Sequence, residues 1–168
     1  MEYKICVFDS MPEMDELPVA KIVNFKGSDD INNNVYAQGR LCYVKNIGLV
    51  VRLWIFEASP ANARSQMTFC LNGDKGNLVL AFSHDGVVQC SVSGKVVAPP
   101  TVNYFEAEDL QGEYWGGQFV FDDEFLQDNL YSDLNFSIGN VLYGNIITFV
   151  NTKGSLFEEE IGKFVLVS

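Results

Sequence analysis

A chain of 168 residues with 11 basic and 22 acidic side chains has a formal net charge of −11. Its few lysines and arginines are scattered singly, which argues against a nucleic-acid partner and against an anionic membrane surface. The length suits one domain, expected over residues 1–168, with enough buried surface for a core that needs no disulfides.

The expected strands are short apolar or alternating runs bounded by turn residues. In chain order they are Tyr3–Phe8, Val19–Phe25, Gln38–Lys45, Leu49–Glu57, Met67–Leu71, Leu78–Ser83, Val87–Val92, Lys95–Ala98, Thr101–Phe105, Tyr114–Phe121, Ile146–Asn151 and Lys163–Val167. Tight turns are predicted at Asn46-Ile47-Gly48 and at Asp85-Gly86, because Asp-Gly between two alternating runs is a strong hairpin signal.

One short helix is predicted after Asp122, a plausible N-cap. Asp123 and Glu124 place acidic groups on the first turn, where the helix dipole favours them, and apolar residues follow at near-helical spacing. About ten strands with one helix and no βαβ alternation predict an all-β fold, either an antiparallel β-sandwich or a flattened barrel.

The most hydrophobic run, Leu49–Glu57, separates into two faces by period-two alternation. Every second residue from Leu49 to Ile55 is aliphatic, so this face is expected in the core, and it ends at Glu57. The opposite face mixes Arg52 with Trp54, which suits a face covered by a loop or partner, or a concave ligand face. We expect Arg52 to stack on an aromatic ring or to pair with a carboxylate, and Arg52 and Trp54 to be exposed or covered together.

Six phrases along the chain carry a family resemblance when they are taken in order. They are GRLCYVKNIGLVVRLWIFEASP (39–60), MTFCLN (67–72), NLVLAFSHDGVV (77–88), EYWGGQFVFDDEFL (113–126), FSIGNVLYG (136–144) and FEEEIGKFVL (157–166). Over roughly residues 36–167 this pattern resembles the carbohydrate-binding-module family 9-like proteins, which are β-sandwiches related to the DOMON sensor domains.

The resemblance implies an antiparallel β-sandwich that binds a carbohydrate, with calcium as a possible cofactor. Family members carry acidic residues after the Glu-x-x-Pro segment and in the next strand, where this chain has NARSQ (62–66) and MTFC (67–70). Because calcium needs several hard oxygen ligands, no calcium ligands are identified here, and no other cofactor is expected.

Candidate sugar-binding residues are aromatic rings that have polar groups beside them. Trp115 next to Gly116-Gly117 is one candidate platform, and the segment GNVLYGN (139–145) offers a second patch. The predicted ligand-binding residues are Arg52, Trp54, Trp115, Tyr143 and Asn145.

Catalytic and metal centres are not expected. The only histidine, His84, lies in a Ser-His-Asp-Gly turn, where Asp85 serves the turn geometry, and no GxSxG or phosphate-binding motif occurs. Adjacent acids point in different directions, so the clusters are interpreted as solvated loops or helix starts: Glu106, Glu108 and Asp109; Asp122–Glu124; Glu158–Glu160. The cysteines, Cys6, Cys42, Cys70 and Cys90, are widely spaced, which predicts buried reduced thiols.

The start of the chain, MEYKICVFDS, lacks the features of a secretory signal, and no window reaches the roughly 18 apolar residues that span a bilayer. If the chain is complete, it is therefore expected to be cytoplasmic.

The sequence thus predicts a non-catalytic carbohydrate-binding-like domain, which either binds a sugar on an aromatic-lined face or has lost that ability. Two alternatives stay open: a protein-interaction or structural β-sandwich, and a lipocalin-like barrel for a small apolar ligand. The oligomeric state is not determined.

Overall fold

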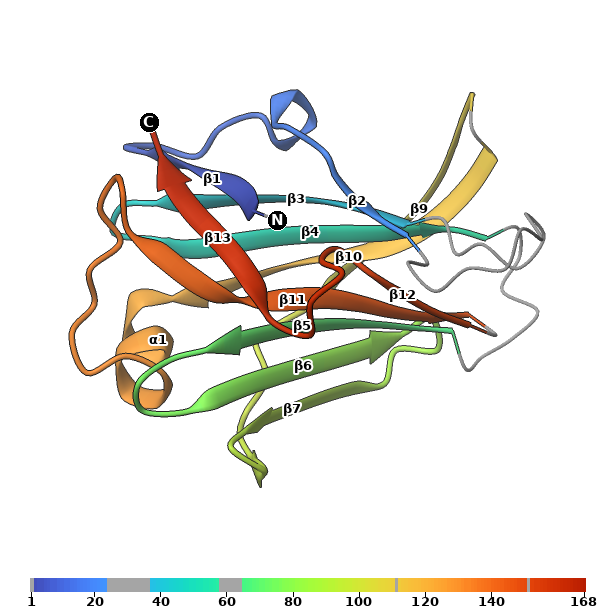
Figure 1. Cartoon of the computed structure of the whole chain (residues 1–168). Coiled ribbons are helices and arrows are strands. Elements are labelled where there is room, and N and C mark those ends of the chain that lie inside the picture. Colours follow the sequence, from blue (N-terminus) through green and yellow to red (C-terminus); the bar gives the residue numbers. More distant parts are fainter. Residues whose placement is uncertain (1, 24–36, 58–64, 111, 151) are drawn as a thin grey trace.

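The computed structural model describes residues 2–23, 37–57, 65–110, 112–150 and 152–168, and this part of the chain is mostly β-strand (Figure 1). In chain order the elements are β1 (Glu2–Phe8), the 3-10 helix η1 (Met14–Glu16), β2 (Ala20–Ile22), β3 (Ala37–Val44), β4 (Gly48–Phe56), β5 (Gln66–Asn72), β6 (Asn77–Ser83), β7 (Val88–Val92), β8 (Lys95–Val96), β9 (Asn103–Asp109), β10 (Gly112–Asp122), α1 (Asp123–Asn129), β11 (Val141–Val150), β12 (Thr152–Ser155) and β13 (Gly162–Val167).

Eleven of these strands form one hydrogen-bonded path, in the order β8-β7-β6-β5-β11-β13-β1-β3-β4-β10-β9. The two remaining strands extend it, because β2 pairs with β3 and β12 pairs with β11. The sheet curls until β6 lies across the core from β10 and β9: the Phe82 ring on β6 is 5.9 Å from the Phe119 ring on β10 and 6.0 Å from the Tyr104 ring on β9. Within the described residues the result is a curled, open sheet (Figure 1).

The expectation of a purely antiparallel sheet is wrong. β1 pairs in parallel with both β13 and β3, so it lies between a strand near the end of the chain and one that follows it. Parallel pairing needs long crossover connections and joins segments that are distant in sequence. Local hydrophobic patterns carry no information about such partners.

Both predicted tight turns are confirmed. In the β3–β4 hairpin Asn46 adopts the left-handed region with φ 66°, and the Ile47 N–H donates to the Val44 carbonyl at 3.0 Å. In the β6–β7 hairpin the Asp85 carboxylate accepts from the Val87 N–H at 3.2 Å, and Gly86 has φ 89°. Side-chain capping of this kind acts within a few residues, which makes it readable from sequence.

The predicted helix is confirmed as α1. The Asp122 side chain accepts a hydrogen bond from the Phe125 N–H at 2.7 Å, the geometry of an N-cap. Several stretches differ from the expected strands: β8 ends at Val96, β9 runs from Asn103 through Asp109, β11 begins at Val141, and β12 was not expected. The predicted strand ends at Phe25 and Asn151 lie outside the described residues.

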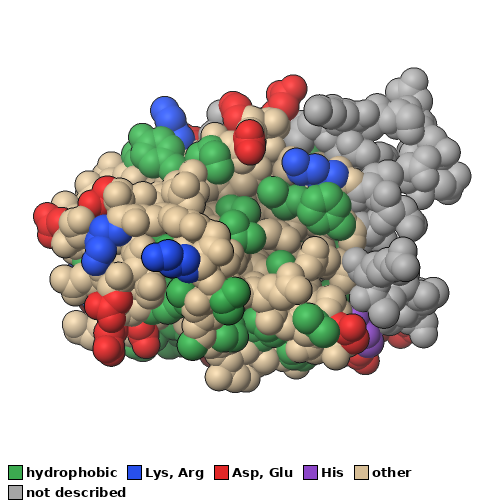
Figure 2. Space-filling view, turned by 90° about the horizontal axis from the view of Figure 1, so that it is seen from below, with side chains coloured by type: hydrophobic (Ala, Val, Ile, Leu, Met, Phe, Trp, Pro, Cys, Tyr) green, Lys and Arg blue, Asp and Glu red, His purple; other side chains and the backbone are tan. Residues whose placement is uncertain are grey.

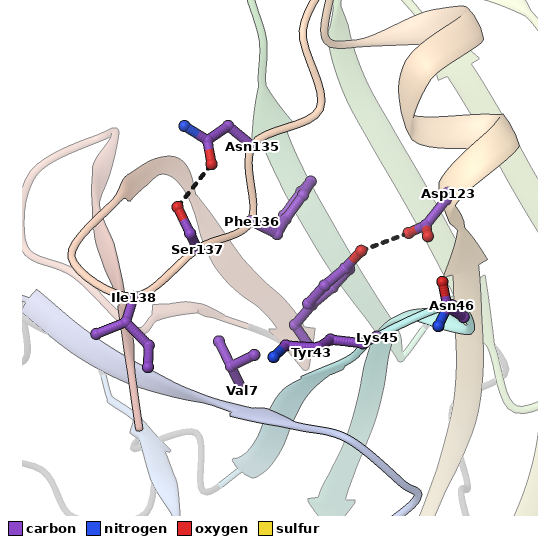
Figure 3. A pocket seen from close by; sticks show the side chains of 9 residues that line it. All are labelled: Val7, Tyr43, Lys45, Asn46, Asp123, Asn135, Phe136, Ser137 and Ile138. Atoms are coloured by element: carbon purple, nitrogen blue, oxygen red, sulfur yellow. Dashed lines mark hydrogen bonds between the residues drawn. The ribbon is translucent and has the colours of Figure 1, made fainter.

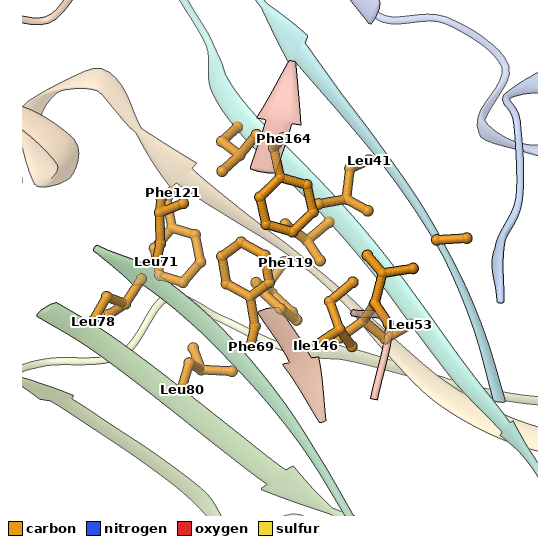
Figure 4. Close-up of a cluster of buried hydrophobic side chains, with 14 of the residues drawn as sticks. Leu41, Leu53, Phe69, Leu71, Leu78, Leu80, Phe119, Phe121, Ile146 and Phe164 are labelled. Atoms are coloured by element: carbon orange, nitrogen blue, oxygen red, sulfur yellow. The ribbon is translucent and has the colours of Figure 1, made fainter. Parts of the chain in front are cut away.

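The main core fills the space inside the curled sheet with aromatic and aliphatic side chains (Figure 4). The face of β4 from Leu49 to Ile55 is at most 1% exposed at every second residue, as the alternation predicts. Phe69 on β5 is fully buried between the rings of Phe119, Phe121 and Phe164, at centre distances of 6.1, 5.8 and 6.4 Å. These contacts join strands from both ends of the sheet path.

A second, smaller cluster lies on the outer face of β3 and β4. Met14 and Leu17, in the segment between β1 and β2, cover Cys42, Val44 and Val50 there. The cysteines only partly match the expectation of buried thiols: Cys42 and Cys90 are buried, whereas Cys6 and Cys70 are half-buried. Among the described residues, no helix has the length and apolar character needed to cross a membrane.

Stability is expected to fall above about pH 10, the ordinary tyrosine pKa. Burial raises the pKa of Tyr3 from 10.0 to about 12, and it is the main reason that the pKa values of Tyr43 and Tyr131 are also raised. The folded state holds these protons more tightly than the unfolded chain. Stability is therefore fully present below the unfolded pKa and is lost as the pH rises through the folded one.

Urea unfolding monitored at about pH 8, 10 and 11 checks this alkaline loss, and Tyr3→Phe should reduce it. Equal free energies of unfolding at the lowest and highest pH would contradict it.

Candidate functional site

Arg52 and Trp54 lie on the outer face of β4, but they are covered to different extents. Trp54 is only 5% exposed, and the Arg40 guanidinium lies over its ring at 5.1 Å from the ring centre. Arg52 is half-buried, with its guanidinium 4.3 Å from the centre of the Phe105 ring and its Nη1 donating to Gln118 Oε1 at 3.3 Å. The expected aromatic partner of Arg52 is thus present, whereas the expectation of equal exposure is wrong.

Tyr143 and Asn145 lie on β11 and differ in role. The Tyr143 side chain is 47% exposed. Asn145 is 2% exposed, and its Oδ1 accepts from the N–H groups of Ile146 at 2.8 Å and Phe157 at 3.2 Å, while Nδ2 donates to the Glu160 carbonyl at 3.1 Å. The amide therefore holds the loop between β12 and β13 on the sheet, and it has no free group for a ligand.

Trp115 points inward from β10 and is 2% exposed. Phe82 meets its ring edge-to-face at 6.1 Å and His84 does so at 5.3 Å, so no ring face is open for stacking. The structure therefore does not bring the predicted residues together: two lie on the outer face of β4, two on β11 and one in the core (Arg52 and Trp54; Tyr143 and Asn145; Trp115).

A cavity of about 540 Å³ opens where the core ends beside Trp115. Four of its eight described lining residues are glutamates, and they come from the end of β4 and from the β9–β10 hairpin. The lining residues are Glu57, His84, Glu106, Ala107, Glu108, Glu113, Tyr114 and Trp115.

Strand register explains why the glutamates gather. Glu57 comes directly after β4, and period-two alternation turns its side chain to the same side of the sheet as the buried face of that strand. Trp115 on β10 is paired with the last buried residue of that face. On the other side of β10, Trp115 is opposite Glu106 and Glu113 is opposite Glu108. Alternation therefore places these carboxylates around the indole, at the open end of the core.

Two polar atoms in the cavity wall lack a hydrogen-bond partner. His84 Nε2 lies 2.6 Å from Glu106 Oε1, and Glu57 Oε2 accepts from the Ser65 hydroxyl at 2.6 Å. By contrast, the Nε1–H of Trp115 and the Oε1 of Glu57 are buried without a partner. An unpaired buried polar group costs about 1–3 kcal/mol, so native proteins leave few of them, and the two residues that carry these atoms line the same cavity.

The lining of the cavity combines hydrogen-bond donors and acceptors. It offers an indole N–H donor, carboxylate acceptors and an imidazole, which are groups that orient a hydroxyl-bearing ligand. In the part of the chain that the structure describes, no group of three or more histidine, cysteine, aspartate or glutamate side chains is arranged to hold a metal ion.

A second cavity, of about 590 Å³, lies near α1 and is lined by Tyr43, Asp123 and Phe136 among others (Figure 3). The Tyr43 hydroxyl donates to Asp123 Oδ1 at 2.7 Å, and its ring stacks on Phe136 at 4.6 Å. Burial, and then the bond to Asp123, raises the tyrosine pKa. Because these polar groups satisfy each other, they tie α1 to β3 and leave less for a ligand.

The fold and the glutamate-lined cavity together define a mostly-β protein with a polar cavity at the end of its core. Comparisons of the chain with protein-family models, with curated proteins and with solved structures gave no match.

Sequence reasoning missed most of this cavity. It interpreted Glu106, Glu108 and Asp109 as a solvated loop; all three are exposed, as expected, but they belong to strand β9, where alternation turns Glu106 and Glu108 to one side. The sequence did contain one signal of the cavity. The buried face of β4 ends at Glu57, and a carboxylate that continues the alternation of a buried face is a candidate for the wall of a polar cavity.

Proposed function

We propose that this protein is a non-catalytic binding domain that holds a carbohydrate in the cavity between Glu57, His84, Glu106 and Trp115. The observation that carries the proposal is that Trp115, which lines the cavity, has a buried Nε1–H without a hydrogen-bond partner. A sugar hydroxyl can accept from this donor and also donate to the free Oε1 of Glu57. The resemblance to family 9-like modules favours a carbohydrate among hydroxyl-bearing ligands.

Cavity size and chemistry support the same ligand class. A volume of about 540 Å³ lies within the usual range for small-molecule sites, roughly 300–1,000 Å³. Carboxylates and an imidazole accept and donate hydrogen bonds in several directions, as a ring with several hydroxyls requires. The proposed site is thus a pocket at the end of the core, in place of an exposed aromatic face.

We also propose that the curled sheet is a β-sandwich, with β5, β6, β7 and β11 in one layer and β3, β4, β9 and β10 in the other. The aromatic contacts between Phe82 and Trp115, and between Phe69 and Phe119, support this reading because they join the two sets of strands face to face. A lipocalin-like barrel needs an open apolar interior, whereas this interior is filled by side chains (Figure 4).

Titration calorimetry with glucose, xylose, cellobiose and their oligomers tests the site. Trp115→Phe removes the indole N–H and should weaken binding about three- to tenfold, while Glu57→Gln should weaken it about tenfold or more, because bonds to charged groups are stronger. The matched control is Trp54→Phe, because Trp54 lies on the outer face of β4. The affinity of this variant for the sugar should be within about twofold of that of the unchanged protein.

Circular dichroism melting shows whether each variant is folded before its affinity is compared. The proposal fails if no saccharide binds, or if folded Trp115→Phe and Glu57→Gln variants bind as tightly as the unchanged chain.

A further inference from the structure

We infer that the ligand of this cavity carries a protonated amine, which makes an amino sugar its natural class. The inference rests on the proposed function and adds the charge of the ligand to it. Glutamates make up half of the described residues that line the cavity, and none of those residues is a lysine or arginine. At the edge of the face in Figure 2 the histidine (purple) lies among acidic side chains (red), in agreement with the His84–Glu106 contact.

The strand register sets carboxylates against one another here. Glu108 and Glu113 are directly opposite in the β9–β10 pair, and Glu106 is the next residue on the same face of β9. Like charges at directly opposed positions destabilise a sheet. A cation held between β9 and β10 would turn this repulsion into attraction.

The unpartnered atoms give a second, independent indication of a ligand. Trp115 is 2% exposed, and its Nε1–H needs an acceptor, whereas the free Oε1 of Glu57 needs a donor. A simple ammonium ion supplies donors only. A hydroxyl-bearing ring that also carries an amine supplies both kinds of group, with the ammonium for the glutamates and a hydroxyl oxygen for the indole.

An organic cation fits better than a metal ion. The described carboxylates do not converge as a metal site requires, and about 540 Å³ is far more space than a bare ion fills.

The test compares three disaccharides that differ in one group: the β-1,4-linked glucosamine disaccharide, its N-acetylated form and cellobiose. Calorimetry at low ionic strength, at a pH where the amine is protonated, should show the glucosamine disaccharide binding about tenfold or more tightly than the two neutral sugars. Added salt should reduce this preference, because partly exposed charges are screened.

The decisive variant is Glu108→Gln/Glu113→Gln, with Glu158→Gln/Glu160→Gln as the matched control. Both remove two negative charges, but the control pair lies in the exposed loop before β13, outside the cavity. The first variant should lose the preference for the amine and melt at the same or a higher temperature. The control should keep the preference.

The outcomes separate this inference from the proposed function. If the charged and neutral disaccharides bind with equal affinity, the inference is wrong and the proposed carbohydrate function still holds. Absence of all binding overturns both. If propylamine binds as tightly as the glucosamine disaccharide, the amine alone accounts for binding, and both the carbohydrate function and the amino-sugar inference fail. A control variant that loses the preference as fully as the cavity variant shows a long-range charge effect and overturns the inference.

Discussion

Replacing Phe69 by alanine is expected to lower the free energy of unfolding by about 3–5 kcal/mol, the range for large-to-small changes of a buried phenylalanine. Phe69 is fully buried and contacts three other phenylalanine rings, Phe119, Phe121 and Phe164. These rings belong to β10 and β13, so the deletion leaves a void where distant parts of the sheet path meet (Figure 4). Since small domains are stable by only about 5–15 kcal/mol, this one change removes a large share.

Urea unfolding measures the effect as a lower transition midpoint with an unchanged dependence on denaturant. Phe149→Ala is the matched control: this phenylalanine lies on the neighbouring strand β11, is 44% exposed, and should cost far less. A loss below about 1 kcal/mol for Phe69→Ala would show that the rings do not pack as described.

Replacing Asn145 by alanine is expected to cost about 2–4 kcal/mol, because it orphans several buried groups at once. The N–H groups of Ile146 and Phe157 lose their acceptor, and the Glu160 carbonyl loses a donor. The loop between β12 and β13 should detach from the sheet. Carbohydrate binding at the distant cavity should be unchanged once the variant is folded, since Asn145 does not line it.

Amide hydrogen exchange measures this effect. The Phe157 amide should exchange faster in the Asn145→Ala variant than in the unchanged protein. Tyr143→Ala, two residues away on the same strand and largely exposed, should change stability by less than about 0.5 kcal/mol. Equal effects of the two changes would contradict the structural role assigned to Asn145.

Prediction from sequence succeeded where the determining contacts are local. The Asp85-Gly86 turn, the Asp122 cap and the alternation of β4 each depend on residues within a few positions of one another. Hydrogen bonds and side-chain direction at this range follow from residue type and spacing.

Prediction of the site was weaker, because a site is made by strands that meet in space. Trp115, a candidate from the sequence, lines the cavity, but its adjacent glycines do not uncover its ring: Phe82 and His84 pack against the ring from β6 and the turn after it. Arg52 and Trp54 were assigned to the correct face of β4, yet their aromatic and cationic partners lie on β9 and β3. Neither partner could be named without the strand order.

By itself the sequence determined that the chain folds mainly into strands, where most of them begin and end, and which face of β4 is buried. Period-two alternation and turn chemistry are properties of the chain itself. Only the tertiary structure decided that β1 pairs in parallel with β3 and β13, and that glutamates from β4, β9 and β10 surround one buried indole. Those arrangements depend on contacts between residues that are far apart in the chain. The free energy of such contacts cannot be predicted from a local sequence pattern.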